Sequence, residues 1–154
     1  MTIHQSFSVA LLNNGPKNTI QPLLDYLAQT QVNLTSKLDS TVKSAIVFGP
    51  PAADQWATLE LFVNQGGTLL YINNPEGELT ELPAIFGAKL TAPTIRSEIR
   101  VLPTDAQNPI CTRMADAYYM TGSFQPIEIT NDSAETVFYA DWRYTHQAMV
   151  TRNT

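Results

Sequence analysis

The chain has 154 residues, of which 44% are hydrophobic and only 15% are charged, and its formal net charge is −5 at neutral pH. This length fits one domain, so we expect residues 1–154 to fold as a single α/β domain. The acidic balance argues against a nucleic-acid partner, because phosphate binding needs clustered Lys and Arg. No apolar run approaches the length of a membrane-spanning helix, which argues against a membrane partner.

The first half alternates short apolar strands with amphipathic helices. Phe7–Leu12 reads as a buried strand, and the turn residues that follow it precede a helix with Thr19 as its N-cap. Four apolar residues then recur at helical spacing, namely Ile20, Leu23, Leu24 and Leu27. Val32–Leu34 suggests a short second strand.

The same pattern repeats once. Ala45–Phe48 is the next apolar strand, and a second amphipathic helix begins near Asp54. Gly66-Gly67 supplies a left-handed helix end, and Thr68–Ile72 is a further strand. Apolar strands between amphipathic helices predict a parallel sheet that is covered on both faces.

The second half is richer in strands. A short helix is expected within Leu79–Phe86, and the expected strands are Glu98–Leu102, Pro126–Thr130, Thr136–Ala140 and Gln147–Thr151. The whole chain therefore predicts an α/β fold, a flavodoxin-like three-layer sandwich with a mostly parallel central sheet.

The carboxyl ends of the strands are the expected ligand site, because open α/β sheets bind ligands there. The loops at that edge are Asn13–Asn18, Gly49–Asp54 and Asn73–Gly77. The amides of Asn14, Asn73 and Asn74 would suit a hydroxyl-rich or carboxylate ligand. Ordinary turn chemistry is the alternative interpretation, since Asn and Gly dominate turns in any protein.

Motifs for cofactors and metals do not occur. Neither phosphate-binding glycine pattern is present, and neither His4 nor His146 has a second His or Cys nearby, so we predict no cofactor and no metal. His146 is interpreted as a surface or half-buried histidine. Asp116, Asp141 and Glu76 are candidate acids, but their spacing does not bring them together.

The single cysteine and the arginines give two further expectations, one about cellular location and one about an anion-binding patch. Cys111 is the only cysteine, and residues 1–10 lack an export-signal pattern, so we expect a cytoplasmic protein in which Cys111 is a small buried hydrophobe. All five arginines lie between Arg96 and Arg152. They are either solvated surface residues or, if several meet, a patch for an anion.

Three segments carry a family resemblance. Trp56–Ile72 is a helix that leads through Val-x-x-Gly-Gly into an apolar strand, Phe86–Leu90 reads Phe-Gly-Ala-Lys-Leu, and Ile99–Ile110 runs from a strand into Asn-Pro-Ile. In this order they resemble the class I glutamine amidotransferase-like superfamily, and within it most closely the trehalose-utilisation family. The resemblance spans roughly Ser44 to Arg152.

The departures from that family concern its polar groups. Asn73 stands where amidotransferases carry the catalytic Cys, and Asn108 stands where the family reads His-Pro. The family's Asp-Glu-x-Tyr element falls on Asp116 to Tyr119, with Ala117 in place of Glu. The resemblance therefore implies that glutaminase activity is lost, because an amide is no nucleophile.

Three hypotheses follow. The first is a non-catalytic or catalytically degenerate domain that binds a small, sugar-like ligand or a protein partner; its ligand-binding residues would be Asn14, Asn73, Asn74 and Asn108. The second is an enzyme of carbohydrate metabolism; its catalytic residues would be Asp116 as acid or base, Tyr119 as an orienting hydroxyl and Glu76 as a second carboxylate. The third is a structural subunit of a homo-oligomer. The family continues with a further edge strand where this sequence stops, so either the protein is a shortened relative or the sequence is cut, and an open sheet edge would favour pairing.

Overall fold

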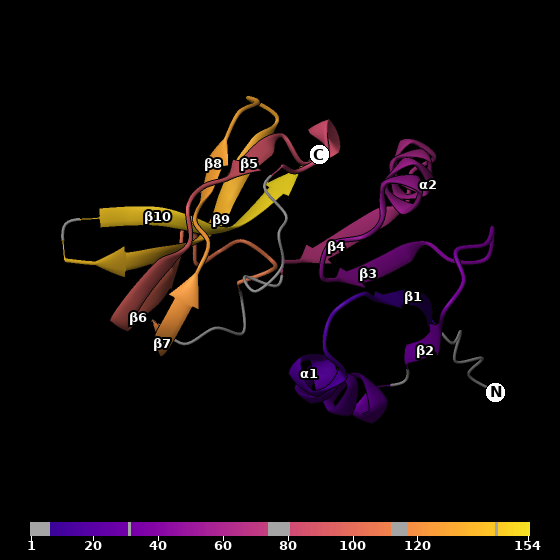
Figure 1. The fold of residues 1–154 in the computed structure, drawn as a ribbon, viewed down its shortest axis with the longest axis horizontal. Coiled ribbons are helices and arrows are strands. Elements are labelled where there is room, and N and C mark those ends of the chain that lie inside the picture. Colours follow the sequence, from indigo (N-terminus) through magenta and orange to yellow (C-terminus); the bar gives the residue numbers. More distant parts are fainter. Residues whose placement is uncertain (1–6, 31, 74–80, 112–116, 144) are drawn as a thin grey trace. The chain divides into compact units, whose positions relative to one another are not determined.

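Two compact units make up the chain, Met1–Glu78 and Leu79–Thr154. The structure, a computed structural model, describes all residues except 1–6, 31, 74–80, 112–116 and 144 (Figure 1). The mixed α/β class is confirmed, with one sheet in each unit. The expectation of one domain over residues 1–154 stays a prediction.

The first unit holds a four-stranded parallel sheet in the order β2-β1-β3-β4. Its elements are β1 (Phe7–Asn13), α1 (Lys17–Gln29), β2 (Val32–Thr35), β3 (Ser44–Phe48), α2 (Ala53–Asn64) and β4 (Thr68–Ile72). Every element expected in the first half is present in the expected order. Figure 1 shows α1 on the β1–β2 side of the unit and α2 on the β3–β4 side.

The start of α1 differs from the prediction. Pro16 is the N-cap, without a side-chain hydrogen bond, and the helix begins at Lys17, so the assignment of Thr19 as N-cap was wrong. The N–H of Thr19 donates to the carbonyl of Pro16 at 3.2 Å, which places Thr19 inside the first turn. The fixed φ of proline lets the chain enter the helix without a capping hydroxyl.

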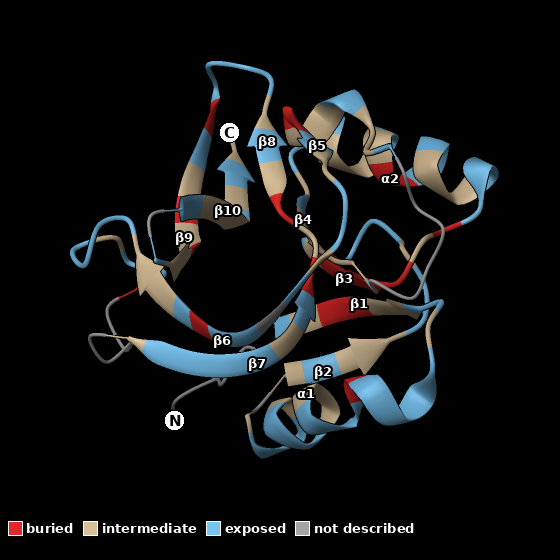
Figure 2. Ribbon diagram, turned by 60° about the vertical axis from the view of Figure 1, so that its left-hand side comes forward, coloured by how far each residue is buried: buried red, intermediate tan, exposed pale blue. Residues whose placement is uncertain are grey.

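The core of the first unit rests on in-register small and apolar residues. Ala10, Ala45 and Leu69 are neighbours across β1, β3 and β4, and Phe62 of α2 packs against this group. The Phe62 ring occupies the space where a side chain on Gly67 would lie, since a Cβ there would be 2.4 Å from the ring. Figure 2 shows the buried residues concentrated in β1 and β3.

The second unit holds a six-stranded antiparallel sheet in the order β5-β8-β10-β9-β6-β7. Its elements are the short helix η1 (Ala84–Phe86), β5 (Ala88–Leu90), β6 (Thr94–Pro103), β7 (Tyr118–Phe124), β8 (Ile127–Ile129), β9 (Ala134–Trp142) and β10 (Thr145–Asn153). The expected short helix and the four expected strands are found, whereas β5 and β7 were not predicted.

The parallel arrangement is thus restricted to the first unit, unlike the mostly parallel central sheet that the sequence predicted. The connections explain this difference. Only two residues separate β9 from β10, which are neighbours in the sheet. A parallel pair needs a crossover of a dozen residues or more, so short connections of this kind force neighbouring strands to run antiparallel.

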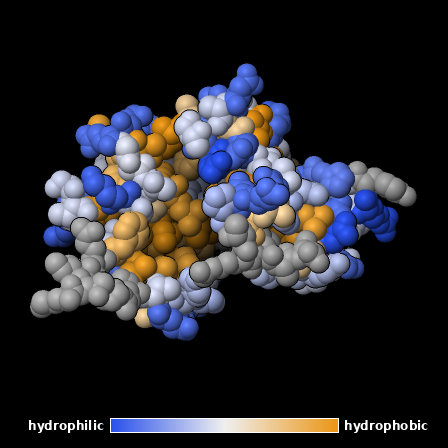
Figure 3. All heavy atoms as spheres, turned by 180° about the vertical axis from the view of Figure 1, so that it is seen from behind, coloured by the Kyte–Doolittle hydropathy of each residue, from blue (hydrophilic) through white to orange (hydrophobic). Residues whose placement is uncertain are grey.

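The low charge leaves several large apolar side chains in contact with solvent. Those of the first unit are Phe7, Tyr26, Leu61 and Leu70, and those of the second are Ile95, Ile110, Tyr118, Tyr119, Met120 and Val150. Figure 3 shows a face on which apolar side chains gather, with hydrophilic side chains around them. No helix in the described part of the chain is long and apolar enough to cross a membrane.

Candidate functional site

Three strand ends are joined at the carboxyl edge of the parallel sheet. The N–H of Asn14, just after β1, donates to the carbonyl of Phe48 at 2.8 Å. The N–H of Gly49, just after β3, donates to the carbonyl of Ile72 at 2.9 Å. The strand order reverses between β1 and β3, so this edge carries the topological switch point at which open α/β sheets bind ligands.

Two glycines allow these loops to touch. Gly49 has φ of +76°, and a Cβ on it would lie 3.1 Å from the nitrogen of Gly15. A Cβ on Gly15 would lie 2.4 Å from the ring of Phe48. Oδ1 of Asn13 accepts a hydrogen bond from the N–H of Gly15 at 3.1 Å, which fixes the first loop. The edge is therefore a closely packed backbone surface with short polar side chains.

The structure places two of the predicted ligand-binding residues at this edge. Asn14 is exposed and Asn73 is half-buried. The hydroxyl of Tyr71 donates to Oδ1 of Asn73 at 2.8 Å, and the ring of Trp56 meets that of Tyr71 edge-on with centroids 5.3 Å apart. Burial raises the pKa of Tyr71 to about 12, so its hydroxyl stays protonated at neutral pH. Asn74 lies outside the described residues.

The fourth predicted ligand-binding residue makes contacts within a turn. Asn108 belongs to the second unit, where Oδ1 accepts from the N–H of Ile110 at 3.0 Å and its carbonyl accepts from the N–H of Cys111 at 2.7 Å. These are turn contacts of the ordinary kind. Glu76 and Asp116 lie outside the described residues, so the proposed acid pair stays a prediction. Tyr119 lies on β7.

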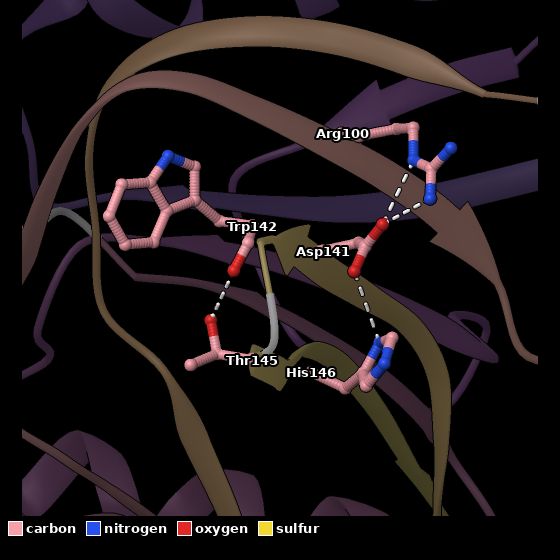
Figure 4. A network of polar contacts seen from close by, with 5 residues as sticks. All are labelled: Arg100, Asp141, Trp142, Thr145 and His146. Carbon is pink, nitrogen blue, oxygen red and sulfur yellow. Dashed lines mark hydrogen bonds and ion pairs between the residues drawn. The ribbon is translucent and has the colours of Figure 1, made fainter.

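A polar row on the antiparallel sheet is the feature that sequence reasoning missed. Four side chains stand in register on adjacent strands β7, β6, β9 and β10, namely Tyr119, Arg100, Asp141 and His146. Nε of Arg100 donates to Oδ2 of Asp141 at 3.0 Å, and Nη2 contacts the same oxygen. Nδ1 of His146 lies 3.3 Å from Oδ1 of Asp141. Figure 4 shows Arg100 and His146 approaching the carboxylate from opposite sides.

Asp141 is less exposed to solvent than Arg100 and His146, its partners in this row. The side chain of Asp141 is 11% exposed, against 46% for Arg100 and 64% for His146. Hydrogen bonding and charge attraction from Asp141 raise the pKa of Arg100, with a smaller contribution from Tyr119. The ring of Tyr139 meets the imidazole of His146 edge-on with centroids 5.2 Å apart. Asp141 thus holds two partly exposed donors in place.

The contact between Asp141 and His146 has a local signal in the sequence, the short turn between β9 and β10. Arg143, at φ of 55°, lies in the turn that pairs Trp142 with Thr145, and the pair next to it is Asp141 with His146. A hairpin turn centred on residues 143 and 144 would have predicted that contact. Within the described ranges, no group of three or more His, Cys, Asp or Glu side chains could hold a metal ion.

Comparisons with known proteins identify the fold. No family model and no curated protein matches the sequence. A ThuA-like protein from Bacteroides uniformis is structurally similar, with a TM-score of 0.71 and 9% identity over 99% of this chain and 80% of that one. Alpha-L-fucosidase isoenzyme 2 from Paenibacillus thiaminolyticus is also similar, with a TM-score of 0.64 and 18% identity over 90% of this chain. This chain corresponds to only 24% of the fucosidase chain.

The chain therefore has an α/β fold shared with a ThuA-like protein. ThuA denotes the trehalose-utilisation family, so this shared fold is consistent with the resemblance noted in the sequence.

Proposed function

We propose that this chain is a carbohydrate-related protein of the trehalose-utilisation type that binds a small sugar-like ligand at the carboxyl edge of its parallel sheet. The observation that carries this proposal is the joining of the β1, β3 and β4 ends, with Asn14 and Asn73 beside them. The fold shared with a ThuA-like protein supports the ligand class.

The chemistry of the edge favours a neutral ligand. The described residues at the three strand ends, Asn13–Gly15, Gly49 and Asn73, carry no charged side chain. An amide both donates and accepts hydrogen bonds, as a sugar hydroxyl does. A carboxylate or phosphate ligand would instead require a cation at the edge to offset its desolvation.

The scaffold that we propose is a degenerate amidotransferase-like one. The order β2-β1-β3-β4 matches the first four positions of the flavodoxin-like order. Asn73 follows β4, where the resemblance places the nucleophile, and its Oδ1 accepts from Tyr71. An amide at that position gives no acyl-enzyme chemistry, so the proposed activity is binding without glutaminase turnover. The buried thiol of Cys111 fits the proposed cytoplasmic location.

A binding titration tests this function. Trehalose and L-fucose are titrated into the full chain while backbone amide signals are followed by NMR. We expect saturable shifts at Asn14, Gly49 and Asn73, and we expect Asn73→Ala to weaken binding about tenfold, the effect of one lost hydrogen bond to a ligand. Asn64→Ala is the matched control, because Asn64 is an exposed amide at the end of α2, away from that edge. Unchanged signals at all three residues with both sugars would refute the proposal.

A further inference from the structure

The polar row on the antiparallel sheet consists of side chains that the proposed site at the carboxyl edge does not use. We propose that Tyr119, Arg100, Asp141 and His146 form a second saccharide-binding face, built on strands β7, β6, β9 and β10 and selective for neutral sugars over anions. It lies in a different unit from the edge proposed above and is independent of it.

The charges in the row set the class of ligand. The guanidinium of Arg100 is paired with the carboxylate of Asp141, so their charges cancel. Both oxygens of that carboxylate are engaged, Oδ2 by Arg100 and Oδ1 by His146. An anion would find no uncompensated positive charge here, whereas a hydroxyl group needs only donors and acceptors.

The exposed atoms of the row supply both kinds of group. A guanidinium has five N–H donors, and Arg100 is 46% exposed, so donors not directed at Asp141 or Tyr119 are open to a ligand. The contact of Nδ1 of His146 with Asp141 favours a proton on Nδ1, so that Nε2 of the neutral imidazole is an acceptor. Adjacent hydroxyls of a sugar ring match such a donor and acceptor pair.

The aromatic ring of Tyr119, at the β7 end of the row, matches the apolar face of a sugar. A pyranose ring has an apolar face of C–H groups and a rim of hydroxyls. Tyr119 is 66% exposed, so its ring is not used for core packing and offers a flat surface to such a face. Tyrosine gives a large contact area with few rotatable bonds, which is why it is favoured at binding surfaces.

The row is also held in its binding geometry. Asp141 is 11% exposed and fixes Arg100 from β6 and His146 from β10, on the strands to either side of β9. The ring of Tyr139 contacts the imidazole and restricts it further. Side chains that are ordered before the ligand arrives lose little conformational entropy on binding, which raises affinity.

The test uses the full chain, with NMR signals followed during titration with trehalose, with L-fucose and separately with inorganic phosphate. We expect saturable shifts at Arg100, Tyr119 and His146 with a sugar and no saturable shift with phosphate. Tyr119→Ala should weaken sugar binding at this face about tenfold or more, the effect of removing an aromatic contact. Tyr118→Ala is the matched control, because Tyr118 is 54% exposed and alternates to the opposite face of β7.

The substitutions are chosen so that the fold is retained, since Tyr119 and Tyr118 are both exposed. Signals from Gly49 and Asn73 report the carboxyl edge in the same spectra, so each proposal can fail without the other. Saturable phosphate shifts in the row, an absence of sugar shifts there, or equal effects of Tyr119→Ala and Tyr118→Ala would overturn the inference. An absence of shifts at Gly49 and Asn73 alone would overturn only the edge proposal.

Discussion

The hydroxyl of Tyr71 donates a 2.8 Å hydrogen bond to Oδ1 of Asn73, so the next-to-last side chain of β4 fixes the residue that follows the strand. The amide group is therefore oriented by the strand itself. In the degenerate amidotransferase-like scaffold that we propose, this is the position of the nucleophile. Here the same position carries an anchored hydrogen-bonding group.

The burial of Tyr71 predicts a loss of stability at high pH. Burial raises the pKa of Tyr71 from 10.0 in an ordinary environment to about 12 in the folded chain. The stabilisation that comes from keeping the phenol neutral is complete below the unfolded pKa and is lost as pH rises through the folded pKa. Urea unfolding across this window should show the decline, and Tyr71→Phe should flatten it. Tyr26→Phe, at a 59% exposed tyrosine of α1, should leave the decline unchanged.

Backbone crowding at the strand ends predicts that alanine substitution at two glycines lowers stability by different amounts. Gly49 and Gly66 both have positive φ, but a Cβ on Gly49 would meet backbone atoms 3.1–3.3 Å away, and one on Gly66 would meet nothing within 4 Å. We expect Gly66→Ala to cost about 1 kcal/mol from its conformation alone, and Gly49→Ala to cost about 2–3 kcal/mol. Equal midpoint shifts in urea unfolding would show that the loops after β1 and β3 are not packed together.

Asp141 is largely buried, so we expect the loss of its charge to lower the free energy of unfolding more than the loss of a charge from an exposed ion pair does. Asp141→Asn replaces one acceptor oxygen by a donor that faces Arg100 or His146, and we expect a cost of about 1–2 kcal/mol in the free energy of unfolding. Glu128→Gln is the control, because the side chains of Glu128 and Lys89 are 58% and 54% exposed. It should change stability by less than about 0.5 kcal/mol. Equal costs would contradict the protected arrangement.

The two tryptophans test whether the units fold as one domain. Trp56 lies in α2 of the first unit and Trp142 lies in β9 of the second. We expect Trp56→Phe and Trp142→Phe, each of which keeps one fluorescent reporter, to unfold with the same midpoint. Leu59→Ala should cost about 3 kcal/mol, because Leu59 is 0% exposed, and should shift both reporters equally. Separate midpoints would divide the chain into two domains.

The first half of the fold follows from local patterns. The spacing of Ile20, Leu23 and Leu27 and the glycines after α2 are signals that each segment carries by itself. The positions of Asn14 and Asn73 at one edge follow as well, because the carboxyl ends of neighbouring parallel strands lie together.

The second half depends on pairing that a local pattern does not encode. The strand β7, which reads Tyr-Tyr-Met-Thr-Gly-Ser-Phe, has no apolar–polar alternation and was missed. The polar row joins residues 100, 119, 141 and 146, and only the last two are related by a short turn. The remaining contacts depend on which strand lies beside β6, and that order is set by packing across the whole sheet.

The position of Asp141 also bears on how the second unit reaches its correct strand alignment during folding. The neighbouring residue, Ala140, belongs to the apolar cluster with Ile99 and Phe124. A slip of β9 by one residue would exchange these two side chains and place an unpaired carboxylate in that cluster, which is strongly unfavourable. We therefore expect the aspartate that orders Arg100 and His146 also to disfavour misaligned pairing of β9 during folding.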